Sequence, residues 1–377
     1  MFLNKQKIQY LTFDSIEEGV GSSQVLAYLN ELSSKHEIRL INFEKKKPLD
    51  STRKKLEDLG IEWIPLDFGR FGFFFGFARV CRLVLQLDPK VPIHARGDLA
   101  AFSAIISGNR RVLWDCRALH ADQRLALSTS KGKYLVYALN RLIEYVVAKK
   151  SFKVNTITFK AARILQERYQ LTSDKFSVIS TCVNTKKFTK KAMPEASCIK
   201  VLIPGTFSSA YDIDLMNRIF RELRKRINLE VTVAVGKGAD QNWRRLDYDI
   251  TIQRNHDEMP TEIGNAHFGM SIWRANLGIC LASVSSTKIP EFLAVGRPVI
   301  ANFNQGEIGE LLSTFRCGVG TSLNSEEYIR KYAEEIIELI RDPGIVERCH
   351  ELAERYFSLE GGIRTLESVY SNLRKLS

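Results

Sequence analysis

The sequence predicts an α/β fold made of two Rossmann-like domains, and three observations lead to this prediction. The chain has 377 residues, a length that suits two domains of average size. It begins with a strand-like run, a glycine-containing loop, a helix and a second strand, the usual start of a parallel sheet that binds nucleotides. The same order of elements returns from residue 200 onwards.

The first half alternates short apolar runs, typical of buried strands, with longer segments whose apolar residues recur at helical spacing. Its first loop contains Gly19 and Gly21 but has Gln24 where a dinucleotide-binding fingerprint would place a third glycine. These two glycines therefore either approach a ligand or form an ordinary turn. In the helix expected at 134–150, Leu135, Leu139, Leu142 and Val146 recur at the spacing of one helical face. The strands are predicted at 8–13, 37–43, 61–66, 92–95, 111–117, 156–158 and 176–179, and the helices at 24–33, 51–59, 78–87, 134–150 and 161–169.

Polar residues follow two of these strands at the point where each strand ends. Ligands of alternating α/β sheets gather at the carboxyl ends of the strands. His94 and Arg96 are such residues, either as a pair facing a ligand or as buried hydrogen-bonding groups. Asp115 and Arg117 end the next strand. His120 follows them and is either a ligand-contacting residue or a surface loop residue.

The second half restarts after a lysine-rich linker at 189–198 that contains Pro194. A strand and glycine-containing loop at 200–207 include Gly205. Three helices end the chain. No internal repeat of short period appears in the sequence. Further strands are predicted at 230–235 and 267–272, and helices at 214–227, 325–341, 344–356 and 359–375.

Residues 285–301 form the most informative segment of the chain. Ser286 or Thr287 is expected to cap a short helix with Pro290 in its first turn. Gly296 suits the left-handed position after the last helical turn, and a strand at 299–300 follows. The free N–H groups of the first turn, together with the Lys288 ammonium, form a site for an anion.

Glu291 lies one turn further along this helix, on a turn expected to be exposed, where its carboxylate can accept hydrogen bonds from a sugar hydroxyl. A phosphate site beside a sugar site indicates a nucleotide ligand. The alternative is an ordinary helix–strand unit with a surface glutamate.

This segment resembles the donor-binding signature of retaining glycosyltransferases of the GT-B type, group 1 or family four, which are built from two Rossmann-like domains facing each other across a cleft. The resemblance implies that Ser286, Thr287 and Lys288 hold the donor diphosphate and that Glu291 holds the ribose. The positions that match the signature in register are Lys288, Glu291, Phe292, Leu293, Ala294, Gly296, Pro298 and Val299.

Further site residues follow from the same resemblance. Gly19, Gly21 and Gly205 correspond to glycines of the family's ligand-contacting loops. Asp115 and Arg117 match a polar strand end that faces the transferred sugar, with His120 beside them; these three and Lys288 are the catalytic candidates. The family's domain order implies an acceptor-side domain at 1–188, a linker at 189–198, a nucleotide-sugar domain at 199–356 and a terminal helix at 357–377 that returns to the first domain.

The sequence departs from the family pattern in two places. Ser283 stands where many members have a first glutamate, and no Arg/Lys pair follows Gly205; Arg274 is a possible replacement cation. The implied activity is transfer of a sugar from a nucleoside diphosphate sugar to a glycan or lipid-linked acceptor with retention, in bacterial surface polysaccharide or glycolipid synthesis. No cofactor or metal is expected, because protein cations offset the diphosphate charge. The alternatives are a non-catalytic nucleotide-sugar-binding or scaffold member and, less favoured, a nucleotide-sugar epimerase.

Charge and cysteine content bear on partners and compartment. Residues 1–191 carry 33 Lys and Arg against 18 Asp and Glu, whereas the remainder carries 22 against 25. The basic half favours an anionic partner such as a membrane surface, while no recognised nucleic-acid motif accompanies the charge. The segment 69–82 combines five phenylalanines with three arginines and is either a membrane-contacting patch or part of the core. Seven cysteines without a paired motif predict a cytoplasmic protein. The basic first half leaves open a peripheral contact with the inner face of the plasma membrane.

Overall fold

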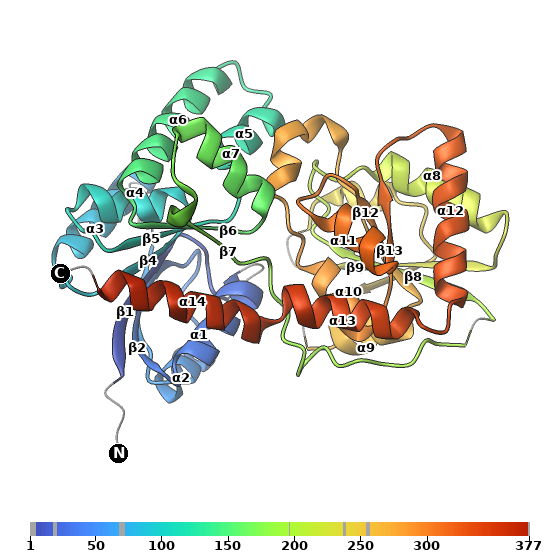
Figure 1. The fold of residues 1–377 in the computed structure, drawn as a ribbon, viewed down its shortest axis with the longest axis horizontal. Helices are drawn as coiled ribbons and strands as arrows, with labels where there is room; N and C mark the ends of the chain where they lie inside the picture. The colour runs from blue at the N-terminus through green and yellow to red at the C-terminus, as the bar shows by residue number, and fades with distance from the viewer. Residues whose placement is uncertain are drawn as a thin grey trace. The chain divides into compact units, whose positions relative to one another are not determined.

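A computed structural model describes residues 5–17, 21–67, 72–195, 197–236, 239–253 and 257–375. The chain divides into two compact units (Figure 1). Unit 1 comprises Met1–Leu125, Thr129–Ile179 and Gly362–Ser377, and unit 2 comprises Ala126–Ser128 and Ser180–Gly361. Each unit contains a parallel sheet flanked by helices, so the predicted fold class of two Rossmann-like domains is confirmed.

The sheet of unit 1 has seven strands in the order β3-β2-β1-β4-β5-β6-β7, and every recorded pairing is parallel. The carboxyl ends of the strands therefore share one edge and their amino ends share the other. The strands are β1 Gln6–Thr12, β2 His36–Phe43, β3 Glu62–Leu66, β4 Ile93–Arg96, β5 Val112–Cys116, β6 Lys153–Thr156 and β7 Phe176–Val178. The helical segments are η1 Gly21–Val25, α1 Leu26–Leu32, α2 Asp50–Asp58, α3 Gly72–Leu85, α4 Asp98–Ile106, α5 His120–Leu127, α6 Lys133–Lys150, α7 Phe159–Tyr169 and η2 Ser173–Lys175, with α14 Leu359–Arg374 contributing its residues from Gly362 onwards.

The sheet of unit 2 has six parallel strands in the order β10-β9-β8-β11-β12-β13. The order reverses between β8 and β11, which is the place where such sheets bind ligands. The strands are β8 Ile199–Gly205, β9 Leu229–Val235, β10 Ile250–Gln253, β11 Phe268–Ser271, β12 Val299–Asn302 and β13 Gly318–Thr321. The helical segments are α8 Ile213–Arg224, η3 Gln241–Arg245, α9 Met259–Asn265, η4 Ala275–Ser283, α10 Lys288–Val295, α11 Ile308–Phe315, α12 Glu326–Arg341 and α13 Ile345–Phe357.

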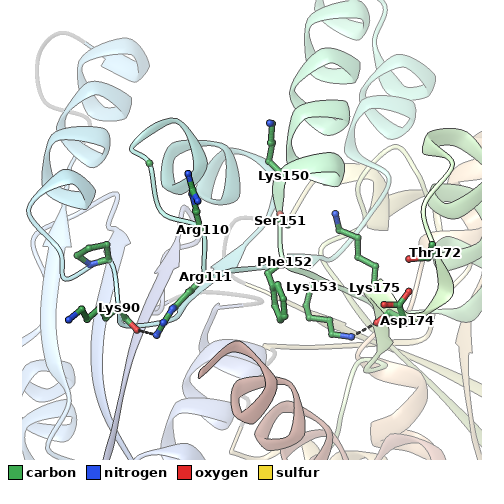
Figure 2. Close-up of a pocket in the computed structure, with 12 residues that line it drawn as sticks. Lys90, Arg110, Arg111, Lys150, Ser151, Phe152, Lys153, Thr172, Asp174 and Lys175 are labelled. Carbon is green, nitrogen blue, oxygen red and sulfur yellow. Dashed lines mark hydrogen bonds between the residues drawn. The ribbon is translucent and has the colours of Figure 1, made fainter. Parts of the chain in front are cut away.

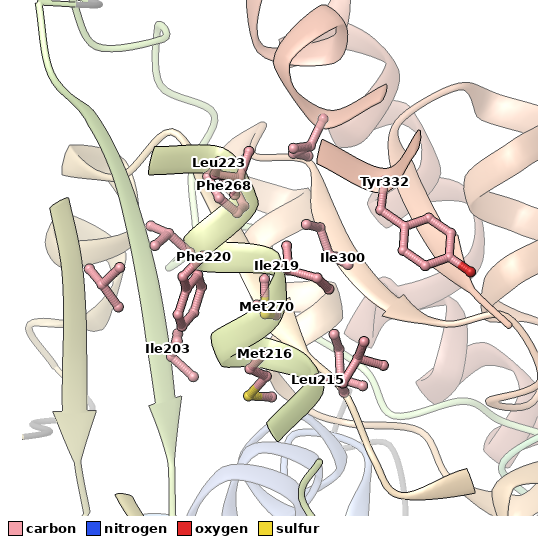
Figure 3. Packing of buried hydrophobic residues seen from close by; sticks show 14 of the residues in the cluster. Ile203, Leu215, Met216, Ile219, Phe220, Leu223, Phe268, Met270, Ile300 and Tyr332 are labelled. Carbon is pink, nitrogen blue, oxygen red and sulfur yellow. The ribbon is translucent and has the colours of Figure 1, made fainter. Parts of the chain in front are cut away.

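A buried layer between α8, α12 and the sheet forms one core of unit 2 (Figure 3). Ile219 and Phe220 of α8 lie over Met270 of β11 in this layer. The helix starts at a side-chain cap, because Asp212 accepts a hydrogen bond from the Leu215 amide at 3.1 Å. This packing fixes the loop between β8 and α8 over the carboxyl edge of the sheet.

The structure contains several elements that the sequence analysis did not predict, and one strand starts earlier than expected. Its predicted strand at 156–158 begins earlier, at Lys153, because Val154 and Asn155 are the buried residues that pair with β5. The helices and strands that were not predicted are α4, α5, α9, α11, β10 and β13. All six are short, with four to nine residues, so they contain too few residues to display a clear period.

The most consequential difference concerns the helix at 133–150. Its regularly spaced leucines face solvent: Leu135 is 78% exposed, and Leu139 and Leu142 are each 58% exposed. The buried side of α6 instead carries Glu144 and Val147. The helix has eighteen residues, whereas its neighbour α4 has nine, so only part of α6 has a packing partner there (Figure 1).

Within the described residues, no helix is long and apolar enough to cross a membrane, and no cluster of His, Cys, Asp and Glu has the arrangement of a metal site. All seven cysteines are free thiols.

Candidate functional site

The segment 285–301 folds largely as its pattern predicts. The helix α10 ends at Gly296, which adopts the left-handed conformation with φ of +89°. A Cβ atom at this position would lie 2.6 Å from Cγ1 of Val346, so steric crowding also requires glycine. The predicted side-chain cap is wrong: Thr287 at the N-cap has helical torsions and makes no capping bond. The Ser286 hydroxyl instead lies 3.4 Å from the Ser271 hydroxyl at the end of β11.

The charged residues of this helix are buried, contrary to the exposed turn expected for Glu291. Lys288 is 7% exposed and Glu291 is 4% exposed. The Lys288 ammonium donates a hydrogen bond to the Tyr211 hydroxyl and lies 4.5 Å from the centre of the Tyr211 ring. It also lies 3.4 Å from where a Cβ atom on Gly205 would be. The backbone at the end of β8 therefore lies directly beside the ammonium.

Aromatic and amide side chains complete this end of the unit 2 sheet. Trp273, which follows β11, stacks on Tyr211 with ring centres 5.4 Å apart. Asn302 at the end of β12 fixes Trp273, because it accepts from the Trp273 amide at 2.7 Å and donates to the Trp273 carbonyl at 2.8 Å. Arg274 donates through Nε to the Tyr211 carbonyl at 3.2 Å. The loops after three strands thus meet at Tyr211, beside Lys288.

Sequence reasoning singled out Lys288, Gly205 and Arg274 but missed Tyr211, Trp273 and Asn302. Asn302 is the last residue of β12 and Trp273 lies two residues after β11, so both stand at the carboxyl end of a strand, which is a usable signal. Ser283, at the position of the missing glutamate, is buried and donates to the Cys280 carbonyl at 3.0 Å.

In unit 1, a second polar cluster surrounds the buried carboxylate of Asp115 at the end of β5. Its Oδ1 accepts from Asn155 at 2.7 Å and lies 3.4 Å from Nη1 of Arg117. Its Oδ2 lies 3.4 Å from both Nη1 of Arg96 and Nε2 of His94. Burial by itself would raise the pKa of Asp115, but Arg117, His94 and Arg96 outweigh it and hold that pKa well below the ordinary value.

The neighbours of Asp115 are themselves held in place. Arg96 also donates through Nε to Asp14 at 2.8 Å. Burial would lower the pKa of the Arg96 guanidinium, but its neighbours, including Asp115 and Asp14, outweigh burial and raise that pKa. Nδ1 of His94 lies 2.7 Å from the hydroxyl of Tyr370 in α14. The buried hydrogen-bonding interpretation of His94 is therefore correct. Burial raises the pKa of the adjacent Tyr10 phenol.

The remaining predicted residues lie apart from these clusters. His120 is the first residue of α5. Burial raises the pKa of the nearby Asp98 carboxyl, and His120 partly opposes that rise. Gly21 opens η1, where a Cβ atom would collide with the Ser15 carbonyl. Gly19 lies outside the described residues.

The phenylalanine-rich segment divides between core and surface. Phe77 packs against Phe13 and Phe102, as the core interpretation expects. Phe75 is 58% exposed, and Arg79 pairs with Asp67 at 3.4 Å. Residues 68–71 and the side chains of residues 73 and 74 lie outside the description.

A strongly basic pocket of about 1020 Å³ lies at the amino-end edge of the unit 1 sheet (Figure 2). Asp115 stands near the opposite, carboxyl end of β5 and does not line it. Its cations come from the segments before β4, β5, β6 and β7, which parallel pairing brings to one edge. Arg111 donates to the Lys90 carbonyl at 2.6 Å and Lys175 to the Lys149 carbonyl at 3.0 Å. Arg111 thus satisfies a carbonyl group in a turn and Lys175 one in the last turn of α6, which is an ordinary structural role. The pocket is lined by Pro89, Lys90, Gly108, Arg110, Arg111, Lys150, Ser151, Phe152, Lys153, Thr172, Asp174 and Lys175.

Comparison with solved structures shows the fold class of the whole chain. A glycosyltransferase from Rickettsia africae superposes with a TM-score of 0.73 at 16% identity over 100% of both chains. Sucrose-phosphate synthase from Thermosynechococcus elongatus gives 0.74 at 12% identity, covering 99% of this chain and 100% of that one. Anabaena Alr3699/HepE in complex with UDP-glucose gives 0.70 at 14% identity, covering 97% and 99%. No family model and no curated protein matches the sequence. The chain therefore has the GT-B fold of these transferases.

Proposed function

We propose that this protein is a glycosyltransferase that moves a sugar from a nucleoside diphosphate sugar to an acceptor with retention of configuration. The observation that carries the proposal is the buried Lys288 ammonium at the start of α10, beside Tyr211 and the bare backbone of Gly205. A buried cation at a helix N-terminus, at the carboxyl edge of a parallel sheet, suits a diphosphate. Glu291, three residues further along α10, suits the ribose hydroxyls.

The same geometry suggests how the chain would assist transfer. Lys288, the amides near Ser286 and Thr287, and Arg274 would stabilise the negative charge that develops on the leaving diphosphate. In a front-face displacement, that leaving group itself accepts the acceptor proton, so no protein carboxylate has to act as a nucleophile. These cations would also make a metal ion unnecessary. In unit 1, Asp115 would orient Arg117 toward the transferred sugar, with His120 as a further sugar ligand.

The donor is suggested by the similar solved structures, and the acceptor by the charge of the first half of the chain. UDP-glucose, the ligand of the Anabaena structure, is the first donor to test. The basic first half, with 33 cations against 18 acidic residues through residue 191, favours a glycan or lipid-linked acceptor that is anionic or lies at an anionic membrane. This fits bacterial surface polysaccharide or glycolipid synthesis at the inner face of the membrane.

The proposal is tested by donor hydrolysis and calorimetric binding across a panel of nucleoside diphosphate sugars. Lys288→Met should weaken binding of the preferred nucleotide at least tenfold, because a charge-assisted hydrogen bond contributes roughly 1.5–3 kcal/mol. Lys190→Met is the matched control, since Lys190 makes an exposed ion pair with Glu347. Hydrolysis should persist in excess EDTA. Equal affinities of the two variants, or a complete loss of turnover that Mg²⁺ restores, would contradict this assignment.

A non-catalytic nucleotide-sugar-binding role is the second candidate. It is favoured by Ser283 at the glutamate position and by the missing Arg/Lys pair after Gly205. Binding of a nucleotide sugar without hydrolysis or transfer to any acceptor would select it.

A further inference from the structure

The helix α6 presents an apolar surface to solvent, which soluble monomers rarely do over a contiguous area. Leu135, Leu139 and Leu142 form one exposed stripe, and Tyr134 and Tyr145, 68% and 47% exposed, lie beside it. We call these five residues the α6 face. The residues of α6 that enter the core lie on its other side and toward its C-terminal end.

Every charged residue in the segment 123–143, which includes most of α6, is positive. Residues 123–143 contain four cations, Arg124, Lys131, Lys133 and Arg141, and no aspartate or glutamate. The next acidic residue, Glu144, is buried, and it accepts from Arg141 at 2.6 Å and from the Tyr169 hydroxyl at 2.6 Å. Its charge is therefore compensated inside the unit.

Aromatic rings and cations also lie together at this face. The Lys133 ammonium lies 5.3 Å from the centre of the Tyr134 ring, and the Arg141 guanidinium lies 5.9 Å from that of Tyr137. Leucine bulk, tyrosine rings and cations without carboxylates are the composition of helices that lie in the interface of an anionic membrane. Leucine enters the acyl boundary, tyrosine remains at the level of the headgroups, and the cations meet phosphate groups.

A second copy of the chain is a poorer occupant. A twofold interface would place the same surface of two molecules together. Lys131 and Lys133 of both copies would then be buried in one interface, with no acidic residue in 123–143 to compensate them. An anionic lipid surface supplies that compensation.

We propose that the α6 face docks the protein on an anionic lipid surface, with the three leucines inserted at the acyl boundary. This deepens the proposed function, because it names the surface by which the enzyme would approach a lipid-linked acceptor. It replaces the phenylalanine-rich segment 69–82 as the main membrane-contacting element. Docking does not require sugar transfer, so the two proposals fail separately.

Sedimentation of the full-length protein with vesicles tests the docking. The probes are vesicles of phosphatidylcholine alone and of phosphatidylcholine mixed with phosphatidylglycerol. We expect retention on the anionic vesicles that weakens as salt is added. The triple variant Leu135→Ser, Leu139→Ser, Leu142→Ser should lose at least tenfold in affinity, while its melting temperature and donor hydrolysis stay unchanged. Lys131→Gln with Lys133→Gln should weaken binding and flatten its salt dependence.

Two control variants assign the effect to this face. Ile279→Ser with Leu323→Ser removes apolar residues of similar exposure, 47% and 52%, from unit 2 and should bind as the wild type does. Arg110→Gln with Lys150→Gln removes charge from the basic pocket at the amino-end edge and should reduce binding only slightly. The proposal is overturned if the triple variant binds normally, if the pocket variant alone abolishes binding, or if the triple change merely dissociates an oligomer.

Discussion

At the scale of single residues, Asp115 shows two opposing influences on one carboxyl group. Burial favours the neutral acid, whereas Arg117, His94 and Arg96 favour the anion and prevail, so the pKa is lowered. A carboxyl whose folded-state pKa lies below its unfolded-state value of about 3.9 stabilises the fold at higher pH. That contribution is complete above the unfolded-state pKa and disappears as the pH falls through the folded-state pKa.

Asp115→Asn should therefore destabilise unit 1 by about 3 kcal/mol near neutral pH, because two guanidinium groups lose their buried counter-charge. The difference from wild type should stay constant from about pH 8 to about pH 5 and shrink below about pH 4. Urea unfolding at a series of pH values measures it, with Asp257→Asn, in an exposed pair with Lys187, as control. A difference that already shrinks between about pH 8 and about pH 6 would point to a histidine instead.

Glu291 is the second residue whose environment sets its expected behaviour. Glu291→Gln keeps the shape of a buried side chain while removing its charge. If Glu291 holds the ribose, nucleotide affinity should fall about ten- to a hundredfold, because a hydrogen bond to a charged group contributes roughly 1.5–3 kcal/mol. Calorimetric titration measures this, with the exposed Glu338→Gln of α12 as control. Unchanged affinity would remove Glu291 from the nucleotide site.

At the scale of elements, Gly296 in the turn after α10 is required both by its left-handed backbone conformation and by close packing against α13. Gly296→Ala should cost about 3 kcal/mol, because it adds left-handed strain of about 1–2 kcal/mol to crowding against Val346 of α13. Gly108→Ala is the matched control: its φ is +86°, yet no atom lies within 4 Å of the added Cβ. Denaturant unfolding should show a clearly smaller loss for the control. Equal losses would mean that strain alone requires glycine.

At the scale of the whole molecule, the C-terminal segment is a structural part of unit 1. Leu366, Tyr370 and Leu373 are buried there, and Tyr370 bonds His94 near Asp115. Each such apolar side chain contributes roughly 1.5–3 kcal/mol of burial. A chain that stops after Gly361 should therefore lose amide protection in β1 and β4 while β8 and β9 keep theirs. Hydrogen exchange measures this, and undiminished protection of β4 would show that unit 1 folds without the segment.

The sequence by itself determined the features that depend on the local chain. Alternating apolar runs and helical spacing specified the two parallel sheets, and residues 285–301 specified a helix ending at a left-handed Gly296 before a strand. These features follow from backbone torsions and from the apolar pattern, which neighbouring residues set directly. The segment also drew attention to Lys288 and Glu291 without the structure.

Only the tertiary structure decided which distant side chains meet and which faces are covered. Lys288 meets Tyr211 from 77 positions away, and His94 meets Tyr370 from 276 positions away. The leucines of α6 have the spacing of a core-facing stripe, yet they are exposed because they lie on the side of the helix opposite the residues that enter the core. The spacing of residues in a helix determines which of them share a face. Which face is buried depends on the other elements that pack against the helix, and the sequence of the helix alone does not specify those contacts.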